Sequence, residues 1–124
     1  PDDFVPPPHC GLSQILIRSF RQAALTNSDD PAEARKYSPT YADLRGLPPV
    51  LVQAASLDYL YKNSLDLIAK AKADGVLDNW EIDLHEGVPH VFVTTPPEVL
   101  PYAAVGMQNI AAFAVRQIQS RFEK

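Results

Sequence analysis

Two runs of residues with different apolar patterning define the middle of this sequence. Residues 50–55 are almost uninterruptedly apolar, which is typical of a strand buried on both faces of a parallel sheet. Residues 80–86 alternate between apolar and polar types, which indicates a strand with one face only partly covered. The alternation stops at Gly87 and Pro89. We therefore expect two strands, the second near the margin of a sheet, where charged side chains discourage further pairing.

The segment between the two expected strands has the pattern of a helix. Residues 61–74 carry apolar side chains at helical spacing, and Gly75 follows as a stop signal. A strand–helix–strand unit of this length forms a crossover between parallel strands, so both strands end at the same edge of the sheet. Asp58 follows the first strand and His90 follows the second. We expect these two residues to lie side by side at the edge where open α/β sheets place ligands and chemistry.

Amphipathic patterning predicts two helices before this unit. Residues 12–25 place Leu16 and Phe20 on the apolar side of a helix. Asp30 is placed as the N-cap, and Pro31 as the first residue, of a second and shorter helix.

A long helix is predicted at the other end of the sequence, over residues 99–122, with Pro101 tolerated in its first turn. Its apolar side should pack back on the sheet and consists of Ala103, Met107, Ile110, Ala114 and Ile118.

Five short motifs in this sequence occur in the order and at about the spacing of a known family. They are Ser38-Pro39, Leu47-Pro48-Pro49, Asp58-Tyr59-Leu60, Asp74-Gly75-Val76 and Gly87-Val88-Pro89-His90-Val91-Phe92. Together they resemble the C-terminal part of α/β-hydrolases of the hormone-sensitive-lipase type, from about Asp30 to the end of the sequence. The resemblance implies that Asp58 is the acid and His90 the base of a Ser-His-Asp triad, in the chain order Ser, Asp, His.

The same resemblance implies an α/β fold class and a division of the chain. Residues 38–124 would form the C-terminal βαβα part of the α/β-hydrolase core, with two parallel strands, a crossover helix and the long C-terminal helix. Residues 1–37 would form a connector and part of a helical cap. The family's Gly-x-Ser-x-Gly elbow and His-Gly-Gly loop do not occur in these residues. We therefore expect the nucleophile and the oxyanion hole to lie in an upstream portion of a longer hydrolase, which is the expected partner of this chain.

The resemblance also suggests which residues meet an acyl-ester substrate. Leu16 and Phe20 of the cap-like helix, together with Leu60 and Val91 beside the triad positions, are expected to line its pocket. The alternative is that Leu16 and Phe20 pack on the sheet as ordinary core residues. Lys62 departs from the family, which often has an acidic residue four places after the triad Asp, and a cation there is placed to pair with Asp58.

Other chemistries find little support in the sequence. His85, Glu86 and His90 spell His-Glu-x-x-x-His, one residue too long for a zincin pair, and Gly87 with Pro89 forbids the helix that such a pair needs. We predict no metal site and no cofactor, and we expect His85 to lie at the surface. Ser56 and Ser64 lack a strand-to-helix elbow and are expected to be loop or cap hydroxyls rather than nucleophiles.

Composition and charge limit the kinds of partner and compartment that we expect for this chain. The net charge is −4 and the eleven Lys and Arg residues are scattered, which argues against nucleic acid. No apolar run approaches the roughly 20 residues that cross a bilayer. The single cysteine, Cys10, excludes an internal disulfide and fits a reducing compartment, which favours the cytoplasm.

Two alternatives to a serine ester hydrolase remain open. One is a small-molecule receptor on the same fold; plant gibberellin receptors resemble this family but have lost the catalytic histidine, so the presence of His90 counts against this alternative. The other is a short interaction module or homodimer that completes its sheet between copies.

Overall fold

Two parallel strands, β1 (Val50–Leu57) and β2 (Trp80–Pro89), form the centre of the structure, a computed structural model that describes residues 10–25 and 30–123. The helix α3 (Tyr61–Ala73) connects them, so the predicted strand–helix–strand unit is confirmed. The register pairs Val50 with Trp80 and continues in step to Ala55 and His85. Among the described residues the sheet has only these two strands, so each strand has one unpaired edge.

Helix α3 ends as its sequence predicts. Gly75 adopts a left-handed conformation with φ of 71°, which a residue without a side chain reaches at little cost. The amide of Gly75 donates to the Lys72 carbonyl at 3.1 Å, and the amide of Val76 donates to the Ala71 carbonyl at 3.0 Å. These two bonds form a Schellman motif, which satisfies the last carbonyls of the helix and turns the chain back toward β2.

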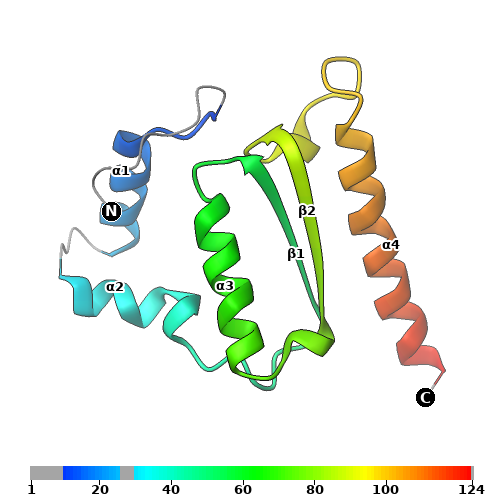
Figure 1. Ribbon diagram of the computed structural model, residues 1–124, viewed down its shortest axis with the longest axis horizontal. Coiled ribbons are helices and arrows are strands. Elements are labelled where there is room, and N and C mark those ends of the chain that lie inside the picture. Colours follow the sequence, from blue (N-terminus) through cyan, green and yellow to red (C-terminus); the bar gives the residue numbers. More distant parts are fainter. Residues whose placement is uncertain (1–9, 26–29, 124) are drawn as a thin grey trace.

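The sheet lies between α3 and the long helix α4 (Ala103–Phe122) (Figure 1). On the α3 side, burial of apolar surface stabilises the packing. The core cluster there is formed by Leu44, Val52, Ala71 and Trp80, with Leu67 and Ile68 packed against it.

Helix α4 packs back on the sheet as predicted, and Ala103 of its predicted apolar side is buried, but polar contacts make much of the connection. The Gln53 side chain donates to the Gly106 carbonyl at 3.0 Å, the Asn109 amide donates to Asp83 at 3.1 Å, and Arg116 pairs with Glu81. Met107 and Ile118 are exposed.

The start of α4 also differs from the expected one. The helix begins at Ala103, so Pro101 lies in the turn before it rather than in its first turn.

The N-terminal helices are α1 (Gln14–Ala24) and α2 (Pro31–Tyr37). The Ser13 hydroxyl caps α1 by accepting from the Leu16 amide at 3.2 Å, and the Asp30 carboxylate caps α2 by accepting from the Ala32 amide at 2.9 Å. Both helices lie on the α3 side of the molecule, and neither has a buried residue (Figure 1).

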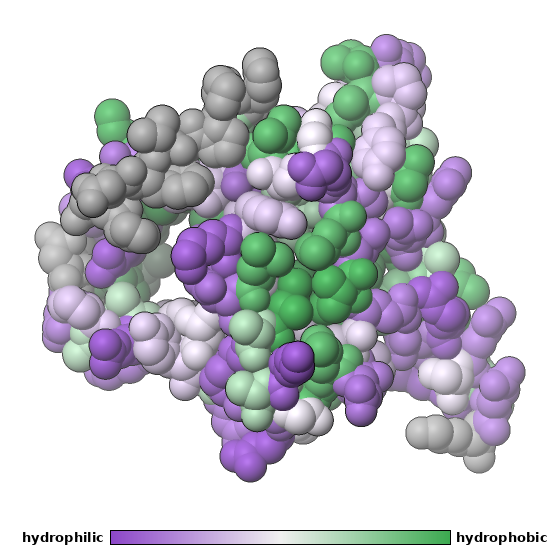
Figure 2. Space-filling view, in the orientation of Figure 1, coloured by the Kyte–Doolittle hydropathy of each residue, from purple (hydrophilic) through white to green (hydrophobic). Residues whose placement is uncertain are grey.

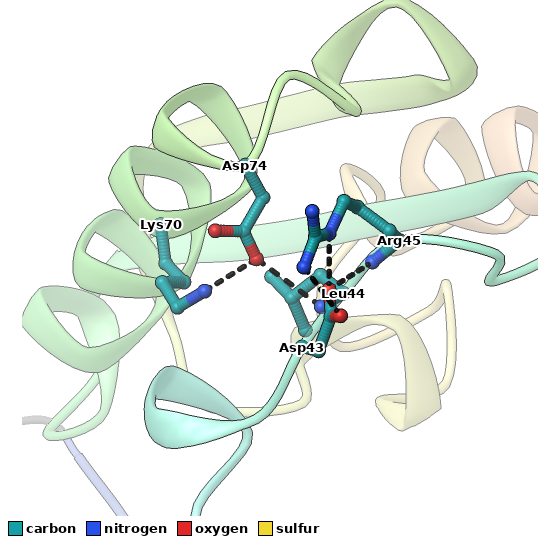
Figure 3. A network of polar contacts seen from close by, with 5 residues as sticks. All are labelled: Asp43, Leu44, Arg45, Lys70 and Asp74. Carbon is teal, nitrogen blue, oxygen red and sulfur yellow. Dashed lines mark hydrogen bonds and ion pairs between the residues drawn. The ribbon is translucent and has the colours of Figure 1, made fainter.

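A polar cluster ties the segment before β1 to the end of α3 (Figure 3). Asp74 pairs with Lys70 and accepts a 3.1 Å hydrogen bond from the Leu44 amide, and Asp43 binds Arg45 at 2.8 Å. Hydrogen bonds from Arg45 lower the pKa of Asp43 to about 2, and those from Lys70 and Leu44 lower the pKa of Asp74. These contacts fix the start of β1 relative to the helix that follows it.

Hydrophobic side chains gather in the middle of the face that Figure 2 displays, over the region of α3 and the sheet. Leu65 of α3 and the β2 residues Ile82 and Leu84 are among the exposed large apolar residues. Within the described ranges, no helix combines the length and the hydropathy that a membrane span requires.

Candidate active site

Asp58 and His90 meet at the carboxyl edge of the sheet. The Nδ1 atom of His90 lies 2.8 Å from Oδ2 of Asp58. Because a carboxylate only accepts hydrogen bonds, the His90 Nδ1–H group is the donor, which leaves the other ring nitrogen, Nε2, for a different partner. The predicted juxtaposition of the two residues is thereby confirmed, whereas their catalytic roles stay predictions.

The turn between β1 and α3 fixes the Asp58 side chain. Its second oxygen, Oδ1, accepts from the Leu60 amide at 2.8 Å, and its backbone carbonyl accepts from the Tyr61 amide at 3.1 Å. The carboxylate lies at the N-terminal end of α3, where the helix dipole favours negative charge. The side chain is 12% exposed, compared with 26% for His90, so the acid lies deeper than the base.

Cys10 binds the same turn from a distant part of the sequence. Its sulfur accepts a hydrogen bond from the Tyr59 amide at 3.1 Å and lies 4.0 Å from Oδ1 of Asp58. The sequence provides no signal for this contact, because a lone cysteine has no spacing pattern. The segment before α1 is thus attached directly to the loop that holds the acid.

An irregularity in β2 sets the position of His90. After the pair Ala55 and His85, the register shifts so that Leu57 faces Pro89, which places extra residues in β2. Gly87 adopts a φ of 73° in this bulge, and its amide donates to the Ser56 hydroxyl at 2.8 Å. Bulges of this kind bend a strand and redirect the side chains that follow. The strand therefore continues past Gly87 to Pro89, directly before His90.

The residue after His90 has an unusual backbone conformation. Val91 has a φ of 46° and is the only described non-glycine residue with a positive φ. A β-branched residue rarely adopts this left-handed conformation, since its Cβ approaches the following carbonyl oxygen. The turn at Phe92–Thr94 follows at once, with the Thr94 amide donating to the Val91 carbonyl at 2.9 Å.

A pocket of about 250 Å³ adjoins the pair. Both Leu60 and Val91 line it, so two of the four predicted substrate-contacting residues lie beside Asp58 and His90. Leu16 and Phe20 do not line it, and Phe20 is 57% exposed. The alternative that these two residues pack on the sheet is wrong, because their helix has no buried residue, whereas their contact with a substrate stays a prediction.

His85 is buried, contrary to the expectation of a surface position, with an exposure of only 3%. Its Nδ1 atom forms a 3.1 Å hydrogen bond with the Tyr102 hydroxyl. Its Nε2 atom lies 2.8 Å from Oδ2 of Asp83, without the alignment of a hydrogen bond. Burial raises the pKa of Asp83, but contacts from Gln53, His85 and Asn109 outweigh it and keep the pKa below its ordinary value.

The remaining candidates have other partners. Lys62 pairs with Asp66 one helical turn along α3, at 2.8 Å, rather than with Asp58 as expected. The Ser64 hydroxyl lies at the pocket but donates to the Leu60 carbonyl at 3.4 Å.

His85 and His90 lie beside separate carboxylates, those of Asp83 and Asp58. In the described residues, no group of three His, Cys, Asp or Glu side chains is arranged to hold a metal ion.

Comparisons with known proteins agree with this geometry at the level of the fold. A family model described as alpha/beta hydrolase fold matches residues 8–94, a span that includes β1, α3, β2, Asp58 and His90. No curated protein and no solved structure gives a match.

Proposed function

Since this chain belongs to the α/β-hydrolase fold family, we propose that it supplies the acid and the base of a serine carboxylic-ester hydrolase of the hormone-sensitive-lipase type. The single observation that supports this proposal best is the 2.8 Å contact between His90 Nδ1 and Asp58 Oδ2 at the ends of two adjacent parallel strands. That contact assigns one ring nitrogen to the carboxylate and leaves the other for a nucleophile.

In the proposed mechanism a serine hydroxyl from the upstream portion attacks the ester carbonyl. Nε2 of His90 takes the serine proton and then gives it to the departing alcohol, and a water molecule repeats the sequence to release the acid. Asp58 holds the ring in the Nδ1–H tautomer and stabilises the imidazolium that forms at each proton transfer. Donors for the oxyanion would come from the same upstream portion, with the serine.

Three structural features support an upstream portion of the same hydrolase as the partner. Both strands have an unpaired edge in the region that the structure describes. Apolar residues of β2, Ile82 and Leu84, are exposed there. Hydrogen bonds in the described region engage Ser56 and Ser64 with backbone groups rather than with His90.

Within the proposed hydrolase, residues 38–124 form the C-terminal βαβα part of the core and residues 1–37 the connector and cap. Leu60 and Val91 contact the acyl ester from the core. Leu16 and Phe20 are exposed on α1. They would contact the substrate if the upstream portion completes the pocket beside this helix.

A fluorophosphonate probe tests the proposal, because it labels a serine only when a base activates it. In the complete hydrolase that contains this chain, we expect rapid labelling of one serine upstream of Pro1. His90→Ala should slow labelling by roughly 10³-fold or more. The matched control Lys62→Ala, which removes only an exposed ion pair, should label at the wild-type rate. Equal labelling of the His90→Ala protein would refute the proposal, as would the absence of any labelled serine.

A further inference from the structure

Phe92 is the most deeply buried aromatic side chain near His90, with an exposure of 2%. It packs against Ala55 of β1 and Val88 of β2 in a small core cluster. The centroid of the His85 ring lies 4.7 Å from the centroid of the Phe92 ring. Both strands therefore pack against Phe92 close to their carboxyl ends, which Asp58 and His90 directly follow.

Helix α4 packs against Phe92 and Val93 at Gly106. A Cβ atom at this position would lie 2.5 Å from Cγ1 of Val93 and 2.7 and 2.8 Å from ring atoms of Phe92. Such distances are far below ordinary van der Waals contact, so Gly106 is required for α4 to lie this close to the turn. The helix and the Phe92 ring cannot both keep their positions if a side chain is added there.

His85 and Tyr102 complete the contact between strand and helix. The hydrogen bond between the Tyr102 hydroxyl and His85 holds the residue that precedes α4. Both rings also contact each other edge to face, at 5.5 Å, and the Tyr102 ring lies 5.9 Å from that of Phe92. Aromatic pairs at such separations stabilise one relative orientation.

Only Val91 separates Phe92 from His90 in the sequence. Because Val91 is held at a φ of 46°, the chain at that residue has little freedom to absorb a displacement of its neighbour. A shift of the Phe92 ring is then transmitted to the imidazole. An enzyme base must be held within a fraction of an ångström to transfer a proton efficiently.

We propose that Phe92 and Gly106 are positioning residues for His90: the Phe92 ring, seated against the bare backbone of Gly106, sets the placement of the imidazole opposite Asp58. The role of His90 as the base rests on the proposed function. The inference that Phe92 sets the position of the His90 ring rests on the packing alone.

Gly106→Ala and Phe92→Leu test this inference in the complete hydrolase. The control is Val52→Ala, which truncates a buried side chain in the other core cluster, on the α3 side of the sheet. Two quantities are measured: the steady-state constants for a short-chain p-nitrophenyl ester, and the ¹⁵N spectrum of His90 in ¹⁵N-histidine-labelled protein. The spectrum reports whether Nδ1 or Nε2 carries the proton.

We expect Gly106→Ala and Phe92→Leu to lower kcat by about 10²-fold with little change in KM, because the substrate still binds but the base is displaced. The same variants should change the ¹⁵N pattern of His90. Val52→Ala should lower the melting temperature and leave both readouts at their wild-type values. If Gly106→Ala does not fold, Phe92→Leu provides the same test without altering α4.

The inference is overturned if Gly106→Ala and Phe92→Leu lose stability like Val52→Ala but keep the wild-type kcat and the wild-type His90 spectrum. Failure of the proposed function has a different signature. In that case the wild-type protein shows no esterase turnover, and the ¹⁵N spectrum alone decides whether Phe92 and Gly106 position His90.

Discussion

The His90 imidazole donates a 2.8 Å hydrogen bond to the Asp58 carboxylate, although the two residues are 32 positions apart in the sequence. Each residue directly follows a strand, and the strands are parallel neighbours. The geometry of the crossover therefore brings acid and base together. The same hydrogen bond specifies which ring nitrogen is free for chemistry.

Asp58→Asn should nearly abolish turnover in the complete hydrolase. An asparagine amide can donate to Nδ1 and so favour the wrong imidazole tautomer, which in a serine protease lowers kcat by about 10⁴-fold. We expect a loss of similar size in kcat with little change in KM, measured with a short-chain p-nitrophenyl ester. Asp66→Asn, which breaks only the exposed pair with Lys62, is the matched control. A turnover of Asp58→Asn close to that of Asp66→Asn would contradict the assigned role of the acid.

Gly87→Ala should destabilise the protein through backbone strain alone. Its φ is 73°, and a Cβ atom there would meet no atom within 4 Å, so steric contact contributes nothing. An L-residue in the left-handed conformation costs about 1–2 kcal/mol. Urea unfolding should show a loss of free energy of this size. Gly11→Ala is the control, since Gly11 also has open space around it but no positive φ.

A loss in Gly11→Ala equal to that in Gly87→Ala would contradict the strained bulge. So would an unchanged free energy of unfolding in Gly87→Ala, because the bulge would then tolerate a side chain.

Stability should fall with acidification through the cluster of Asp43 and Asp74. Both carboxyls have pKa values in the folded protein below the ordinary 3.8, with that of Asp43 at about 2. A lowered pKa contributes stability above the unfolded value, and this contribution is lost as the pH falls through the folded value. We expect the free energy of unfolding to decrease between about pH 4 and pH 2.

The variant Asp43→Asn/Asp74→Asn tests this origin of the acid sensitivity. It should be less stable than wild type at pH 7, and the difference should shrink as both proteins are titrated toward pH 2. Chemical denaturation across this pH range measures the difference. A constant gap between the two proteins would show that these carboxylates do not cause the pH dependence.

The sequence predicts the centre of the molecule well because local signals and global fold agree there. The apolar run at residues 50–55, the stop at Gly75 and the alternation after Trp80 each identify one element, and the crossover rule then places Asp58 beside His90. Motif order adds the α/β-hydrolase fold, which the match over residues 8–94 supports.

Prediction from the sequence is wrong where the burial of a side chain depends on residues far away along the chain. Alternation along β2 indicates a wet face, but α4 covers that face with its own polar groups, and the result is a buried His85 beside Asp83. The contact of Cys10 with the acid loop depends on the path of the chain and has no local signature. The close approach of α4 to the turn at Phe92 and Val93 depends on the small residue at Gly106, which the predicted apolar stripe does not indicate.

The most direct test of the central claim is the turnover of a short-chain p-nitrophenyl ester by the complete hydrolase, compared between wild type, His90→Ala and Lys62→Ala. We expect His90→Ala to lose several powers of ten in kcat, on the order of 10⁴-fold or more, while Lys62→Ala stays near wild type. Wild-type turnover in His90→Ala would contradict the assignment of His90 as the base.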